Sequence, residues 1–154
     1  MEGHTNKAWE NHADNVIKVI RSYVPNAEIY LVPADPRGMK YLIEKDVALI
    51  NVSLGGNGKA PMYDVLAEKA FICCGAGNSA ENGESWLSIQ DYSCAVGAVD
   101  KHLNPTYYSS FGADKIQTVA VEPYIDGKLL RGTSFTSPTV IGLLAQWYIW
   151  FKDN

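Results

Sequence analysis

Short apolar runs separated by polar turns predict that helices and strands alternate along the chain. Apolar residues between 16 and 23 recur at spacings that place them on one face of a helix, which Pro25 ends. Other runs are short and rich in branched or aromatic residues, as strands are. Strands are expected at 27–33, 47–52 and 71–74, and short helices at 39–44 and 61–69. Because the two kinds of element alternate with short links, the pattern favours an α/β fold with a mostly parallel sheet between helices.

After residue 78 the segments between the predicted elements become longer and more polar. Strands are predicted at 93–99 and 116–121, and a strongly apolar helix is predicted from about 138 to 151. We expect this helix to be largely buried against the sheet, with its aromatic residues in the core rather than in a ligand site. Its apolar residues are Val140, Ile141, Leu143, Leu144, Trp147, Tyr148 and Trp150.

Length, composition and charge indicate how many domains the chain forms, which partners it binds and in which compartment it works. The 154 residues predict a single domain, and 47% hydrophobic content predicts a core of ordinary size. The net charge is -4 and no basic cluster occurs, so no nucleic-acid partner is expected. No apolar run reaches membrane-spanning length, and no secretory signal opens the sequence, so neither insertion nor export is expected. The cysteines, Cys73, Cys74 and Cys94, lie in apolar stretches, which predicts reduced core residues in a cytoplasmic protein.

Residues 75–80 (GAGNSA) match the glycine pattern of a dinucleotide-binding loop, and Asp100 follows at the expected distance. That chemistry needs a helix to open inside the motif, because the pyrophosphate binds at a helix N-terminus. The next residues (ENGES) start a helix poorly, and the carboxylates of Glu81 and Glu84 would repel phosphate. We therefore predict that this match is accidental. No acidic cluster has calcium-loop spacing either, so no metal or cofactor is expected.

Residues 132–140 (GTSFTSPTV) carry the strongest chemical pattern. Gly132 permits a tight entry into a helix, and Pro138 suits the first turn of that helix. The hydroxyl of Ser134 would lie at the N-terminus of this helix. Free N–H groups and the helix dipole favour developing negative charge there. The alternative is that Ser134 merely caps the helix.

The same nine residues resemble the nucleophile motif of the subtilisin-like serine peptidases (subtilases), although Thr136 stands where the family has a small residue. Residues 73–78 (CCGAGN) are similar to the family segment whose asparagine, here Asn78, stabilises the oxyanion. Residues 50–56 (INVSLGG) are similar to the strand that pairs with extended substrate. The resemblance implies a reduced subtilisin-like fold from about His12 to the last helix. It implies substrate contacts at Ser53, Leu54, Gly55, Gly56, Gly75, Ala76 and Gly77.

The resemblance also assigns the general base to His12, at the start of the first helix. The family motif there is HGTHVAG, whereas residues 12–17 (HADNVI) lack its glycine and its second histidine. The spacing to the helix and to the following apolar run is nevertheless similar. His4 and His102 match no motif, and a lone histidine near a helix start is otherwise a surface residue.

A subtilase triad also needs an aspartate on a strand upstream of the histidine, and only 11 residues precede His12. We therefore expect a minimal form without that strand, open to three interpretations. A Ser134–His12 pair could act alone or with Glu2 or Glu10, whereas Asp14 is turned about 200° away along the helix. A second chain, a homo-oligomer or a piece of the same protein removed by processing could supply the acid. Alternatively, the chain binds peptides along residues 53–56 without cutting them. The favoured prediction is a cytoplasmic serine endopeptidase acting on peptide or protein substrates.

Overall fold

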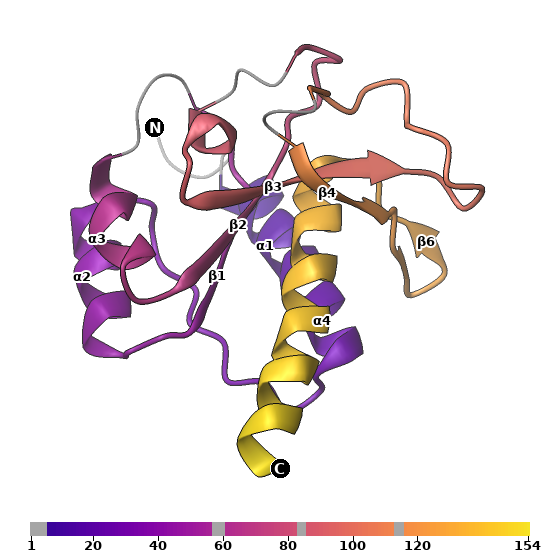
Figure 1. Ribbon diagram of the computed structural model, residues 1–154. Helices are drawn as coiled ribbons and strands as arrows, with labels where there is room; N and C mark the ends of the chain where they lie inside the picture. The colour runs from indigo at the N-terminus through magenta and orange to yellow at the C-terminus, as the bar shows by residue number, and fades with distance from the viewer. Residues whose placement is uncertain (1–5, 57–60, 83–85, 113–115) are drawn as a thin grey trace.

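The computed structural model of the protein describes residues 6–56, 61–82, 86–112 and 116–154. A four-stranded parallel sheet runs through its centre in the order β1-β2-β3-β4 (Figure 1). The strands are β1 (Leu49–Val52), β2 (Phe71–Gly75), β3 (Ser93–Val99) and β4 (Ile116–Val121). The register places Asn51 of β1 beside Cys73 of β2, and Cys73 beside Cys94 of β3. This sheet, with helices on its faces, confirms the α/β prediction.

Two helical layers cover the sheet because its side chains alternate between two apolar faces. On one face, α1 (Asn6–Tyr23) and α4 (Thr133–Asp153) lie side by side (Figure 1). Their Ile20 and Ile141 form a buried cluster with Cys73 and Val96. The other face packs against α2 (Pro36–Glu44), a 3₁₀ turn (Pro61–Tyr63) and α3 (Asp64–Ala67). That larger cluster contains Met39, Leu42, Ile50, Val52, Tyr63, Leu66, Ala70, Ile72, Cys74, Leu87 and Ala95.

The cysteines behave as core residues, as predicted. Cys73 and Cys74 are buried, Cys94 is half-buried, and all three are free thiols. Burial raises the pKa of Cys74 to about 12, which keeps this thiol protonated and unreactive near neutrality.

Most predicted elements occur, and 93–99 and 116–121 have the predicted bounds. The predicted strand at 27–33 is wrong, because this segment has no ladder to a described strand. Its side chains still alternate as in an extended chain: Ile29 packs against one cluster, and Tyr30 and Val32 against the other. The segment therefore has strand-like packing without the hydrogen-bonded neighbour that defines a strand.

The last helix is longer and less buried than its sequence indicates. It begins at Thr133, five residues before the predicted start, with Pro138 inside it. Its first half is buried, but Trp147, Tyr148 and Trp150 are each more than half exposed. The expectation that these aromatics belong to the core is therefore wrong, because α4 extends past the end of the sheet (Figure 1).

Two further features complete the described fold. A short hairpin of β5 (Tyr124–Ile125) and β6 (Lys128–Leu129) follows β4, and its Asp126 forms an exposed ion pair with Lys18 of α1. After β2, residues 76–80 form a loop rather than a helix, so the glycine pattern lacks the helix that a dinucleotide needs. Among the described residues, no helix combines the length and the apolarity needed to cross a membrane.

Candidate active site

The predicted site residues gather at the carboxyl ends of the parallel strands. Ser53 directly follows β1, and Asn78 follows β2 by three residues. The N-terminus of α4, with Ser134 in its first turn, contacts both segments through hydrogen bonds. Open parallel sheets place ligand sites at this edge, since the connecting loops meet there.

The turn before α4 presents Ser134 at a helix N-terminus, as predicted. Gly132 has φ +125°, a conformation that a residue with a side chain adopts only under strain, so glycine is required there. Thr133 is 2% exposed and begins the helix, and Ser134 follows it, half-buried. Ser134 is thus accessible at the positive end of the α4 dipole, which favours negative charge.

A line of polar side chains ties this turn to β1. The Ser53 hydroxyl donates to the Ser134 carbonyl oxygen (2.6 Å) and accepts from Asn51 Nδ2 (2.8 Å). The Asn51 oxygen accepts from the hydroxyl of Ser137, one helical turn beyond Ser134 (2.6 Å). Since Ser137 is fully buried, the relative position of β1 and α4 is fixed by satisfied polar contacts.

His12 lies within α1, six residues after Asn6 rather than at the start of the helix as predicted, and it is beside the first turn of α4, which carries Ser134. Its ring is 5.3 Å from that of Phe135, the residue after Ser134, and 6.1 Å from that of Trp9. Its Nε2 atom is 3.1 Å from the carbonyl oxygen of Ser53. A carbonyl oxygen only accepts hydrogen bonds, so Nε2 carries the proton in this arrangement.

Thr133 holds the loop that carries Asn78 against the first turn of α4, as a clamp. The Asn78 Oδ1 atom accepts from the Thr133 N–H (2.9 Å) and from its hydroxyl (3.1 Å), and the same hydroxyl accepts from the Gly77 N–H (3.1 Å). Because Oδ1 is engaged, the Asn78 amide group is oriented with Nδ2 as its remaining donor. Gly75 allows the approach, since a Cβ there would lie 2.7 Å from the Thr133 hydroxyl.

A second clamp was not predicted from the sequence. The Tyr108 hydroxyl accepts from the Gly132 N–H (2.8 Å) and donates to the carboxylate of Glu122. Glu122 is only 9% exposed, at the end of β4. Burial, and then the hydrogen bond to this carboxylate, raise the pKa of Tyr108 and keep the phenol protonated. A carboxylate directly after the predicted strand at 116–121 is the one sign of this pair in the sequence.

The remaining predicted contacts divide by exposure. Leu54 and Gly55 are exposed and Ser53 and Gly56 half-buried, which leaves the 53–56 segment open to a ligand. Gly75 and Gly77 are half-buried, but Ala76 is fully buried, so its side chain lies away from any ligand surface.

The candidate acids are not joined to the histidine. Glu2 lies outside the described residues, and Glu10 is an exposed residue of α1. Within the described segments, no hydrogen bond or ion pair links a carboxylate to His12. The third member of a triad is therefore not assigned to a residue.

Comparison with known proteins points to subtilisins. Subtilisin DY of Bacillus licheniformis is 27% identical over 158 residues, which cover 86% of this chain and 57% of the relative. Proteinase T of Parengyodontium album is 35% identical over 106 residues, covering 62% of this chain and 36% of the relative. The chain thus spans about half the length of the curated relatives it matches. No family model matches the sequence.

Solved structures agree on the architecture. A lanthipeptide protease superposes with a TM-score of 0.70 at 18% identity, over 87% of this chain and 59% of the other. A cold-adapted subtilisin-like serine proteinase gives a TM-score of 0.61 at 20% identity, over 73% and 46%. The chain therefore has a subtilisin-like α/β fold and is similar in sequence to subtilisin-like serine proteases along most of its length.

Proposed function

We propose that this chain carries the serine half of a peptidase site and hydrolyses peptide bonds of a peptide or protein substrate. The observation that carries the proposal is the convergence of Ser134, His12 and Asn78 at one edge of the sheet. Three segments far apart in sequence bring these residues there, each held by hydrogen bonds or ring contacts. This is the set of groups that acyl transfer needs: a nucleophile, a base and an oxyanion donor.

Ser134 attacks the scissile carbonyl carbon, and its hydroxyl proton passes to His12. The negative charge that develops on the carbonyl oxygen is stabilised by Asn78 Nδ2 and by the Ser134 N–H. His12 then gives the proton to the leaving amine. Water hydrolyses the acyl-enzyme in a second round with the same base.

Substrate binding has a defined effect on His12 in this scheme. The Ser53 carbonyl, which now accepts from His12, is also the acceptor that an extended substrate beside 53–56 would use. When a substrate N–H takes that acceptor, His12 loses its partner, and a shift of its proton from Nε2 to Nδ1 leaves Nε2 able to accept from Ser134. Binding thus prepares the base for proton transfer.

Without a carboxylate to orient the imidazole, turnover would be low. Disabling the aspartate of an intact triad lowers turnover by about 10⁴. A carboxylate from a second chain, or Glu2 or Glu10 of this one, would raise the rate by fixing the tautomer of His12. We propose that this reaction takes place in the cytoplasm.

A fluorophosphonate probe, which forms a covalent bond only with an activated serine, tests the proposal. Labelling of the wild-type protein should be lost in Ser134→Ala and strongly reduced in His12→Ala. Ser22→Ala is the matched control, since Ser22 lies at the C-terminal end of α1 and its hydroxyl donates to the Val19 carbonyl of the same helix, and it should label normally. Labelling that survives Ser134→Ala would refute the assignment of the nucleophile.

A peptide-binding module without activity is the second candidate. One observation favours it: His12 Nε2 is engaged by Ser53 rather than by the Ser134 hydroxyl. If the wild-type protein binds peptides but is not labelled by the probe, binding without cleavage is the function.

A further inference from the structure

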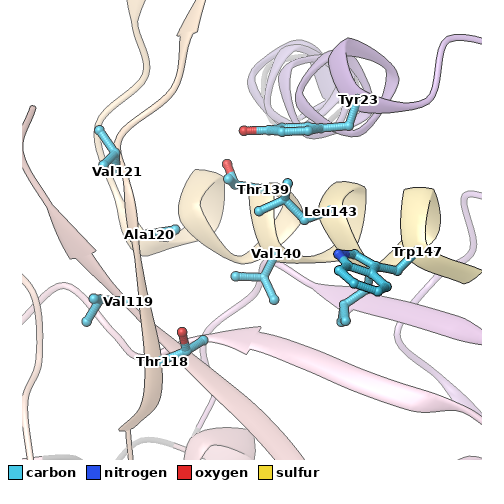
Figure 2. Close-up of a pocket in the computed structure, with 10 residues that line it drawn as sticks. Tyr23, Thr118, Val119, Ala120, Val121, Thr139, Val140, Leu143 and Trp147 are labelled. Carbon is cyan, nitrogen blue, oxygen red and sulfur yellow. The ribbon is translucent and has the colours of Figure 1, made fainter.

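The exposed half of α4 carries a continuous apolar surface. Trp147 is 60% exposed, Trp150 56% and Phe151 62%, and their rings contact one another. Towards the sheet, this surface continues into an open groove of about 470 Å³ between α4, β4 and Tyr23 (Figure 2). Val119, Val140 and Leu143 line the groove together with Trp147. Nothing among the described residues covers this face.

The spacing along the helix is that of a helix-packing seam. Val140, Leu143, Trp147 and Trp150 follow each other at intervals of three, four and three residues, the heptad spacing with which two helices pack side by side. We call these four residues the α4 seam. Leu144 and Phe151 flank it on the same side of the helix. The seam therefore fits a second helix with an apolar stripe.

Charge decides between the possible occupants. From residue 132 to residue 151 the sequence has no charged side chain, and the whole chain has a net charge of -4. A helix that binds lipid surfaces usually presents lysine or arginine beside its aromatic face, and an acidic protein is repelled by anionic lipid. An occupant of this surface should instead be apolar and uncharged along its own contact.

We propose that the α4 seam packs against the α4 seam of a second copy of this chain in an antiparallel, two-fold dimer. If the two-fold axis passes between Gln146 and Trp147, Trp150 of each copy faces Leu143 of the other, because the two residues are equally far from the axis along the helix. Lys152 and Asp153, of opposite sign, then flank the contact at both ends.

The exposed area agrees with a dimer. Side chains of this size offer about 150–250 Å² each, so the three aromatics expose roughly 300–400 Å² together. Val119 and Val121 of β4 and the aliphatic residues of the groove enlarge the patch. The aromatics alone thus supply about half of the roughly 800 Å² that each partner of a stable interface buries, and the residues around them supply more.

Sedimentation equilibrium from about 1 μM to about 200 μM tests the dimer. The wild-type protein should pass from monomer to dimer, and Trp147→Ser combined with Trp150→Ser should remain a monomer with an unchanged circular dichroism spectrum. Tyr107→Ser is the control, because Tyr107 is 84% exposed on another part of the molecule and should leave the dimer intact. A wild-type monomer across the range would overturn the proposal, as would a dimer that persists in the double variant. Cosedimentation of wild-type monomer with phosphatidylcholine vesicles would assign the surface to lipid instead.

Discussion

The two halves of α4 reverse the usual relation between polarity and burial. In the first half, Thr133, Thr136 and Ser137 are polar and at most 2% exposed, and each is hydrogen-bonded. In the second half, Trp147 and Phe151 are aromatic and mostly exposed. The first half holds its place by hydrogen bonds to segments far away in sequence, whereas the second half exposes most of its large aromatic side chains. Burial along this helix therefore follows its position over the sheet rather than its hydrophobicity.

Thr133→Val should have the largest effect on stability. Valine keeps the shape but removes the hydroxyl that accepts from Gly77 and donates to Asn78. The half-buried Gly77 N–H then loses its acceptor and the Asn78 oxygen loses a donor, so the free energy of unfolding should fall by roughly 2–3 kcal/mol in urea denaturation. Thr139→Val is the control, because the Thr139 hydroxyl donates only to a helix carbonyl of its own turn, and it should lose under about 1 kcal/mol. Equal losses in both variants would contradict the clamp.

Gly142→Ala tests the junction of the two halves, where α4 touches α1. A Cβ at Gly142 would lie 2.6 Å from the Tyr23 ring, so the helices must separate. Overpacking costs roughly 1–3 kcal/mol, and alanine regains up to about 1 kcal/mol of helix propensity, for a net loss of about 1–2 kcal/mol.

A double-mutant cycle gives that prediction its control. In a Tyr23→Ala background the ring is gone, so Gly142→Ala should become neutral or stabilising. If its effect on the midpoint of denaturation is the same in both backgrounds, the close contact is not the cause.

Tyr108→Phe tests the second clamp, in which Tyr108 binds Gly132 just before the first turn of α4. It removes both the acceptor of the Gly132 N–H and the donor to the Glu122 carboxylate while retaining the ring, and should cost roughly 1–2 kcal/mol of stability. Because the turn carries Ser134, the rate of fluorophosphonate labelling should also fall, by roughly 3- to 10-fold. Glu122→Gln keeps an oxygen that accepts from Tyr108 and should retain most of the rate. A full labelling rate in Tyr108→Phe would show that the clamp is not needed to position Ser134.

These comparisons also explain what sequence can predict in this protein. The runs 93–99 and 116–121 were predicted with the correct bounds, because strand formers bounded by turns are a local property. The 27–33 segment has the same composition, but a strand also needs a neighbour, which its own residues do not specify. The exposed aromatics of α4 were misassigned for the same reason, since their burial depends on what lies beyond the sheet.

The candidate site also combines features that a local motif predicts with contacts that it does not. Ser134 and Asn78 could be predicted as site residues because each lies in a contiguous motif. The pairing of Thr133 with Asn78, and of Tyr108 with Glu122 and Gly132, joins residues 14–55 positions apart. Such contacts arise only when the strands and loops assemble, so composition and spacing do not reveal them.

Trp150→Ser should have the smallest effect on the isolated chain. Trp150 is 56% exposed, so at concentrations where the protein is monomeric the free energy of unfolding should change by at most about 0.5 kcal/mol. At high concentration the wild-type protein gains stability by association, and the variant lacks that gain, so the two melting temperatures should diverge as concentration rises. Thermal melts across a concentration series measure both regimes. A large loss already in the monomer would mean that the aromatic half of α4 stabilises its own chain, and the contrast between the two halves of the helix would fail.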